Sequence, residues 1–326
     1  MRRALLPVLA FVLFVAGCTL APKYEPPTAP VPDAWPQGGA YGGPNRQAHH
    51  PFPHELEWRE FFTDERLCRV IETALANNRD LRLAALNVEM ARAMYGIQRA
   101  SLFPALDAVG SGSKERVPAD LSQTRQRMTT ERYAVDLGIL SWEVDFFGRI
   151  RSLKDQALEE YLASEEGRRG ARLLLIAEVA NAYFTLATDR ESLQLTLSTL
   201  EAQQASYDMI RRRYETGLSS ELELRQAQTR VDVARRNAAI YTRLAAQSEN
   251  ALNLLAGVPV PKELLPENLS CVMPPREVFT GLSSAVLLRR PDILQAEHLL
   301  KAANANIGAA RAAFFPRISL TAAIGT

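Results

Sequence analysis

Apolar residues recur at seven-residue intervals along two long stretches of the chain, as they do on the packed stripe of a long helix. The first stretch runs from Arg149 to Glu215 without a proline, and the second runs from Glu221 to Ala256. Gly217 interrupts the pattern between them and predicts a tight turn. Because neither helix can bury its stripe alone, we expect a helical hairpin over 149–256 that packs against further helices. The two stripes consist of Val179, Leu186, Leu193, Leu200, Tyr207 and Tyr214, and of Leu224, Val231, Ala238, Ala245 and Leu252.

A period of two marks a different kind of segment around residue 136. Tyr133, Val135, Leu137 and Ile139 alternate with small or polar residues. This alternation predicts a strand with one apolar face. It is typical of a membrane β-strand with lipid on one side and water on the other, although a soluble sandwich has the same period. The charged, apolar-poor segment 113–131 predicts an exposed loop, so we expect a β-hairpin within 105–145.

Part of the chain occurs twice. Asp80–Pro104 and Asp292–Pro316 align at an offset of 212 residues, and each copy ends in Phe-Pro before a strand-like run. We expect each copy to be a helix followed by a strand, with Asp80 as the N-cap of the helix in the first copy. The second strand-like run stops at Thr326, so we expect the sequence to be truncated at its C-terminus.

The N-terminus predicts export and lipid attachment. Arg2 and Arg3 precede the apolar stretch Ala4–Ala16, which is too short to cross a bilayer core of about 30 Å. The run LFVAGC then ends in Cys18 and is similar to a bacterial lipobox. We expect residues 1–17 to be a signal peptide, Cys18 to be acylated, and Thr19 in the next position to favour the outer membrane. An ordinary secretory signal with an incidental cysteine is the alternative.

The next segment, 18–63, is rich in proline and predicts an irregular tether. Its histidines, His49, His50 and His54, have no cysteine or spaced carboxylates beside them, so we interpret them as solvated linker residues rather than metal ligands. Cys68 and Cys271 are the remaining thiols; we favour two separate half-buried groups, and pairing stays open.

Charge and motifs argue against several classes of function. The chain has 38 basic and 37 acidic residues and a net charge of +1, so it has no basic field for nucleic acid. Asp145–Gly148, which reads DFFG, is not a kinase metal motif, because no glycine-rich loop or lysine strand precedes it. With histidine nearly confined to the tether, no nucleophile has a candidate base. We expect no catalytic residues, no metal site and no cofactor, and hence no enzyme.

Several segments together resemble the TolC-type outer-membrane factors, most closely the OprM-like (NodT-type) lipoproteins of drug-efflux pumps. The resemblance covers essentially the whole chain. Besides the lipobox, it rests on NNRDLRLAALNVE, SWEVDFFGRIRS, RYETGLSSELELRQAQ and LLRRPDILQAEH.

The resemblance implies a mainly α fold with membrane β-strands. Long antiparallel helical hairpins and a β-hairpin from each of three protomers would form an α-helical barrel and a 12-stranded β-barrel, whose closure leaves no strand edge in lipid. It divides the chain into the signal peptide 1–17, the tether 18–63, a first repeat 64–274 and a truncated second repeat 275–326.

The implied function is a passive exit duct in the outer membrane that extends into the periplasm. The protein would be a lipid-anchored homotrimer that contacts a periplasmic adaptor and, through it, an inner-membrane pump of the RND type. A channel for type I protein secretion and a structural periplasmic coiled-coil lipoprotein are the alternatives.

The resemblance also assigns roles to residues. The hairpin tip would contact the adaptor, and Glu223 would be a candidate gate residue, where the family often has Asp. Independently of the resemblance, we expect Arg211, Arg212 and Arg213 to face solvent, with pairing of one of them to Glu223 or to a neighbouring tip as the alternatives. The tip residues are Tyr214, Gly217, Leu218, Ser219 and Ser220; the expected lipid-facing strand residues are Tyr133, Val135, Leu137 and Ile139.

Overall fold

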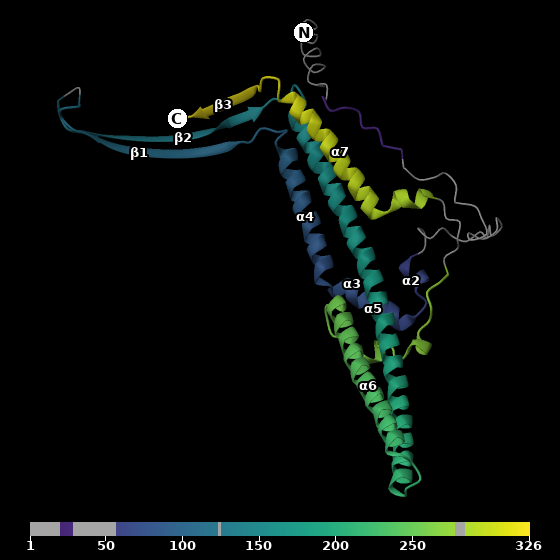
Figure 1. The fold of residues 1–326 in the computed structure, drawn as a ribbon. Helices are drawn as coiled ribbons and strands as arrows, with labels where there is room; N and C mark the ends of the chain where they lie inside the picture. The colour runs from purple at the N-terminus through teal and green to yellow at the C-terminus, as the bar shows by residue number, and fades with distance from the viewer. Residues whose placement is uncertain (1–19, 29–56, 123–124, 278–283) are drawn as a thin grey trace. The chain divides into compact units, whose positions relative to one another are not determined.

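The computed structural model describes residues 20–28, 57–122, 125–277 and 284–326 (Figure 1). The predicted signal peptide, Cys18 and most of the tether, including His49, His50 and His54, lie outside the described residues. The chain forms two compact units. The described residues of the first, here the sheet unit, fall within 1–29, 87–166 and 294–326, and those of the second, the hairpin unit, within 30–86 and 167–293.

The sheet unit contains one antiparallel sheet in the order β1-β2-β3. The strands are β1 (Asp107–Val117), β2 (Met128–Glu143) and β3 (Ser319–Gly325). The β1–β2 ladder runs without interruption from Asp107 opposite Gly138 to Val117 opposite Met128. The β2–β3 ladder has an irregularity between Ile139 and Trp142. The sheet therefore combines strands from both copies of the repeat.

The prediction of an exposed loop over 113–131 is wrong at both ends of that segment, which make up nearly half of it. Residues 113–117 belong to β1 and 128–131 to β2. The ladder continues because backbone pairing does not require apolar side chains, and Lys114 forms an ion pair with Glu131 directly across it. The true connection is therefore restricted to residues 118–127.

Three helices meet the sheet at its base: α4 (Arg79–Ala100), the start of α5 (Arg149–Glu215) and α7 (Pro291–Ala312). Asp145 accepts the backbone N–H groups of Ile150 and Arg151 at 3.0 and 2.9 Å, which satisfies donors that a helix start leaves free. The rings of Phe147 and Phe315 stack with centroids 4.4 Å apart. This stack joins the entry to α5 to the exit from α7.

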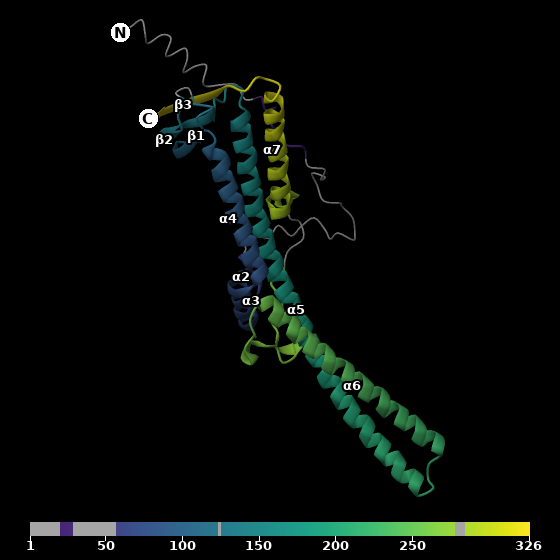
Figure 2. The same cartoon turned by 90° about the vertical axis from the view of Figure 1, so that its left-hand side faces the viewer.

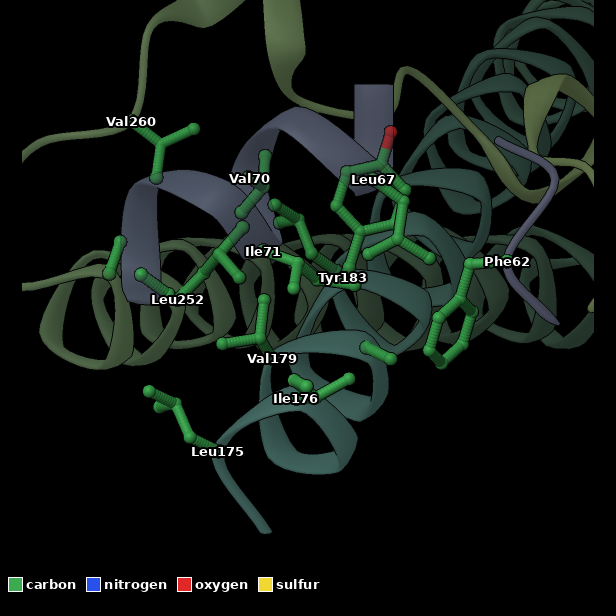
Figure 3. Close-up of a cluster of buried hydrophobic side chains, with 14 of the residues drawn as sticks. Phe62, Leu67, Val70, Ile71, Leu175, Ile176, Val179, Tyr183, Leu252 and Val260 are labelled. Atoms are coloured by element: carbon green, nitrogen blue, oxygen red, sulfur yellow. The ribbon is translucent and has the colours of Figure 1, made fainter. Parts of the chain in front are cut away.

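The hairpin unit has its own apolar core (Figure 3). Helix α3 (Glu65–Asn77) packs there against the middle of α5 and the end of α6 (Glu221–Ala256). The short helix α2 (Trp58–Phe61) and the 3-10 turns η2 (Lys262–Leu264), η3 (Leu269–Cys271) and η4 (Ser284–Arg289) complete the described elements. The side chains labelled in Figure 3 are Phe62, Leu67, Val70, Ile71, Leu175, Ile176, Val179, Tyr183, Leu252 and Val260.

Local signals fix the ends of these helices. Asp64 caps α3 by accepting the N–H of Leu67 at 3.0 Å. The expectation that Asp80 caps the next helix is wrong, because Asn78 accepts the N–H of Leu81 at 2.8 Å and α4 begins at Arg79. The amide of Asn78 also donates to the carbonyl of Leu255 at 2.9 Å. Asn78 therefore ties the start of α4 to the end of α6.

The predicted helical hairpin is present as α5 and α6, which lie side by side in the hairpin unit (Figure 2). Its seven-residue stripes are buried near the core and less buried toward the turn: Val179 and Leu186 are buried, whereas Tyr214 is exposed. On α6 the decrease is confined to the first stripe residue: Leu224 is half-buried, whereas Val231, Ala238, Ala245 and Leu252 are buried. Cover within this chain is therefore weakest along the end of α5 and at the start of α6.

Candidate functional site: the hairpin turn and the apolar sheet face

The turn between α5 and α6 begins with a Schellman motif. The N–H of Leu218 donates to the carbonyl of Arg213 at 2.8 Å, and the N–H of Gly217 donates to that of Tyr214 at 2.9 Å. Gly217 has a φ of 77°, the left-handed region where residues with a Cβ are strained. A Cβ at this position would meet nothing within 4 Å. Gly217 is thus required for its backbone angle rather than for space.

A capping box begins α6 on the other side of the turn. The Ser220 hydroxyl accepts the N–H of Glu223 at 3.3 Å, and the Glu223 carboxylate accepts the N–H of Ser220 at 3.2 Å. The hydroxyl of Ser219 donates to the same carboxylate. Hydrogen bonds therefore fix the turn both at the end of α5 and at the start of α6.

These hydrogen bonds determine the electrostatics of Glu223. The donors Ser219 and then Ser220 hold the pKa of the Glu223 carboxyl below its usual value, and the charge of Arg213 acts in the same direction. Arg211 pairs with Glu215 at 3.0 Å, so it is committed elsewhere. Within this protomer the Glu223 carboxylate serves the cap of α6, and its role as a gate stays a prediction.

The rigid turn presents apolar side chains to solvent. Leu218 and Leu222 are 70% and 67% exposed, and Tyr214 is 40% exposed. Four of the five predicted tip residues are exposed; Ser219, which donates to Glu223, is half-buried. Sequence reasoning missed Leu222, which lies in the first turn of α6 and is as exposed as Leu218 in the turn before it. Exposed leucines at a rigid turn are suited to contact with another protein.

An open groove of about 510 Å³ lies along α5 farther from the turn and was not anticipated from the sequence. One side is lined by α5 and the other by Arg235 of α6. A groove open to solvent does not enclose a small molecule, so it is not a candidate active site. Its lining residues are Leu197, Leu200, Glu201, Gln204, Ala205, Asp208 and Arg235.

The sheet of the other unit has two chemically different faces. Tyr133, Val135 and Leu137 of β2 are 74%, 65% and 46% exposed, and Ile139 is half-buried. Residues paired across a ladder share a face, so Ala108, which pairs with Leu137, and Ile324, which pairs with it from the other side, join this apolar surface. The opposite face is mainly polar: besides Val109, which pairs with Asp136, it carries Asp107, Ser111, Ser113, Arg132 and Asp136.

Gly138 lies on the polar face at a point of close approach between β2 and β3. A Cβ there would lie 2.6 Å from the carbonyl oxygen of Ala322 and 2.8 Å from the Cα of Ala323. Any side chain at Gly138 would therefore push the strands apart.

The two described cysteines are free thiols. Cys68 is half-buried and its thiol donates to the carbonyl of Phe62 at 3.3 Å, while Cys271 is exposed, not half-buried as expected. Burial, with the charge of Asp64 second, raises the pKa of the Cys68 thiol. Within the described ranges, no group of three His, Cys, Asp or Glu residues is placed to hold a metal ion.

This chain combines a three-stranded antiparallel sheet with a long helical hairpin. That combination is the protomer fold of TolC-like outer-membrane channels. The fold matches the open-state MtrE outer membrane channel of Neisseria gonorrhoeae, with a TM-score of 0.76 and 36% identity over 95% of this chain and 67% of that one. A membrane protein from Pseudomonas aeruginosa matches with a TM-score of 0.79 and 41% identity over 93% of this chain and 66% of that one. The predicted fold class is confirmed.

The chain belongs to the outer membrane efflux protein family, whose model matches residues 70–258 and 282–326. It is 49% identical to the probable efflux pump outer membrane protein TtgC of Pseudomonas putida over 100% of this chain and 67% of that protein. It is 41% identical to the outer membrane protein OprJ of Pseudomonas aeruginosa over 98% of this chain and 65% of that protein. The chain thus spans about two thirds of the length of its relatives.

Proposed function

We propose that this protein is the outer-membrane channel subunit of a drug efflux system of the RND type. The observation that carries the proposal is the joining, in one chain, of a sheet with an exposed apolar face and a helical hairpin with a rigid, exposed turn. The apolar face of the sheet suits a barrel wall that faces lipid, and the exposed turn of the hairpin suits contact with another protein in water. The family match and the efflux-pump relatives support the same function.

The functional protein is a homotrimer in this proposal. Three copies of the sheet close into a barrel, which removes the free strand edges that lipid does not tolerate. Three copies of the hairpin surround a helical duct, which covers the weakly buried stripes near the turn. The duct is passive, so it needs neither a catalytic residue nor a cofactor.

Each proposed site has a role in this assembly. Acylated Cys18 anchors the chain in the outer membrane, and the apolar sheet face contacts lipid. The turn contacts a periplasmic adaptor, which links the channel to an inner-membrane pump. Glu223 contributes its charge to the aperture while it caps α6. The lipid-contact residues are Tyr133, Val135, Leu137 and Ile139; the adaptor-contact residues are Tyr214, Gly217, Leu218, Ser219 and Ser220.

Photocrosslinking in living cells tests the adaptor contact. A photoreactive amino acid at Leu218, which is exposed at the turn, should crosslink to a periplasmic adaptor. The matched control is the same amino acid at Gln247, an exposed position of α6 far along the helix from the turn. Absence of an adaptor crosslink from position 218, or equal crosslinking from 247, would contradict the assignment of the turn.

A further inference from the structure

An extended N-terminal segment, residues 20–24, lies against one face of α7 within the sheet unit (Figures 1 and 2). The amide nitrogen of Asn304 donates to the carbonyl of Pro22 at 2.8 Å. Nη1 of Arg311 donates to the carbonyl of Leu20 at 3.2 Å. The ammonium of Lys301 lies 5.5 Å from the centre of the Tyr24 ring, within the range of a cation–π contact.

The geometry of these contacts is that of an ordered chain on a helix face. Lys301, Asn304 and Arg311 follow one another at spacings of three and seven residues, so their side chains share one side of α7. Their partners Tyr24, Pro22 and Leu20 occur in the reverse order, so the segment runs antiparallel to the helix. Leu20, Pro22 and Tyr24, at alternate positions of the segment, all contact α7, as expected for extended backbone.

Gly308 allows the segment to approach the helix. A Cβ at position 308 would lie 2.8 Å from both the backbone nitrogen and the Cβ of Ala21, and 2.7 Å from Oγ of Ser152 on α5. The backbone of the segment therefore occupies space that any other residue at 308 would need. Gly308 is buried, in a helix whose buried residues are all small.

The internal repeat provides a built-in comparison. Gly96 of α4 is the counterpart of Gly308, yet a Cβ on Gly96 would meet nothing within 4 Å. Asn304, which holds Pro22, is replaced there by Arg92. Both helices have the glycine, but only α7 has the N-terminal segment packed against it. The presence of a glycine in each copy of the repeat therefore does not by itself explain the contact between residues 20–24 and α7.

We propose that this face of α7, formed by Lys301, Asn304, Gly308 and Arg311, is a docking site for residues 20–24 that holds the lipid-bearing end of the chain at the base of the sheet. The proposal rests on the acylation of Cys18 proposed above. A residue two positions before Leu20 can lie at most about 7 Å from it, because an extended chain spans about 3.3–3.6 Å per residue. Leu20 contacts Arg311, one turn before Phe314, whose side chain is 90% exposed where the chain leaves α7 toward β3.

With the segment docked at this point, the acyl chains enter the membrane at the same level at which the strands enter it. Aromatic side chains are enriched at the interfaces of membrane barrels, and Phe314 is placed to mark that level. The counterpart of Phe315 in the first copy, Phe103, is also 66% exposed at the exit from α4. The docked segment thus fixes how far the lipid anchor lies from the strands it accompanies.

Tryptic cleavage after Lys23 tests the docking directly, because the Lys23 side chain is exposed while its neighbours Pro22 and Tyr24 are held on α7. The protein, expressed from its own gene and purified in detergent, should be cut slowly at this bond. Gly308→Ala should increase the rate about tenfold or more, whereas Gly96→Ala, the matched change in the other repeat copy, should leave it unchanged. Equal rates for both variants would overturn the proposal.

A second variant covers the case in which Gly308→Ala disturbs α7 itself through Ser152. Asn304→Ala combined with Arg311→Ala removes the two hydrogen bonds that these side chains make to the segment, without adding an atom to the interface, and it should also accelerate cleavage. An unchanged rate for this double variant would overturn the proposal whatever Gly308→Ala does.

The mass of the released peptide separates this inference from the proposed function. A fragment of residues 18–23 that carries acyl chains supports the anchor as well as the docking. A fragment without acyl chains would contradict the lipid-positioning role and the proposed anchor, while the ratio of cleavage rates would still decide whether residues 20–24 dock on α7.

Discussion

Ser220 and Glu223 cap each other at the start of α6, each side chain accepting the backbone N–H of the other residue. A negative charge at a helix N-terminus is stabilised by the helix dipole as well as by these donors. The residue predicted to act as a gate therefore has a structural role that an aspartate, with its shorter side chain, would fill less well. An experiment on the gate role of Glu223 therefore has to distinguish the effect of its charge from the effect of its hydrogen bond at the start of α6.

The capping box predicts different effects for two substitutions. Ser220→Ala removes the side-chain acceptor at the cap and should lower the free energy of unfolding by about 1 kcal/mol. Glu223→Gln keeps an oxygen for the Ser220 N–H but loses the charge, so it should lower the stability only slightly at neutral pH while raising passive leakage if Glu223 also closes the aperture. Denaturant unfolding and uptake of a large antibiotic measure the two effects, and unchanged uptake in Glu223→Gln would remove the gate role.

The lowered pKa of Glu223 also predicts a pH dependence. A carboxyl whose pKa is lower in the folded than in the unfolded state adds stability above the unfolded pKa, and this contribution is lost as the pH falls through the folded value. The difference in stability between the wild type and Glu223→Gln should therefore shrink under acidic conditions. Unfolding curves at neutral and acidic pH measure it; a difference that grows on acidification would contradict the hydrogen-bonded carboxylate.

The two faces of β2 should respond differently to charge. Val135→Arg places a cation on the apolar face and should cost about 2 to 4 kcal/mol near the bilayer midplane. Ala134→Arg, one residue earlier on the opposite face, should cost much less. Gly138→Arg is unsuitable as the control because of the contact with Ala322. The abundance of folded trimer in outer-membrane fractions is the measurement, and equal losses from the two variants would mean that the faces are assigned wrongly.

Cys18 should be the site of lipid attachment. Cys18→Ser should abolish metabolic labelling with palmitate and leave the signal peptide uncleaved by the lipoprotein peptidase. Each acyl chain buries methylene groups at about 0.8 kcal/mol apiece, so several chains anchor a protein firmly. Labelling that persists in the variant would exclude the lipobox.

The hairpin core should be sensitive to loss of volume at Leu252, which is fully buried where α6 meets α3 and α5. Leu252→Ala should lower the free energy of unfolding by about 2 to 5 kcal/mol because it leaves a cavity. Leu252→Met, which conserves volume, should cost less than about 1.5 kcal/mol. Circular dichroism during denaturation distinguishes them, and similar costs would show that the packing at this site is loose.

The periodic parts of the fold were predictable from the sequence because their signals are local. Seven-residue stripes locate α5 and α6, and the alternation from Tyr133 to Ile139 locates β2. The charged ends of β1 and β2 were not predictable, since they are strands only through pairing with each other, as Lys114 and Glu131 show. The pairing of β1 with β2 depends on both strands together, so neither segment alone has a sequence pattern that indicates a strand.

The candidate sites show the same limit. The turn was found because Gly217 has a recognisable local role, and the capping box, which was missed, could have been read from the spacing of Ser220 and Glu223. The close approach at Gly138 and the contact of Ala21 with Gly308 could not, because each depends on a strand or segment distant in sequence. The repeat pointed to Gly96 and Gly308 as equivalent, and the structure distinguishes them.

The most direct test of the central claim, an efflux channel that acts through the turn of its hairpin, is drug resistance in a strain from which this gene has been deleted. We predict that the deletion sensitises the cells and that the wild-type gene restores resistance. Leu218→Asp should fail to do so although its trimer is equally abundant in the outer membrane, because substitutions at an exposed turn usually cost little folding energy. A deletion without effect on resistance, or full restoration by Leu218→Asp, would contradict the account.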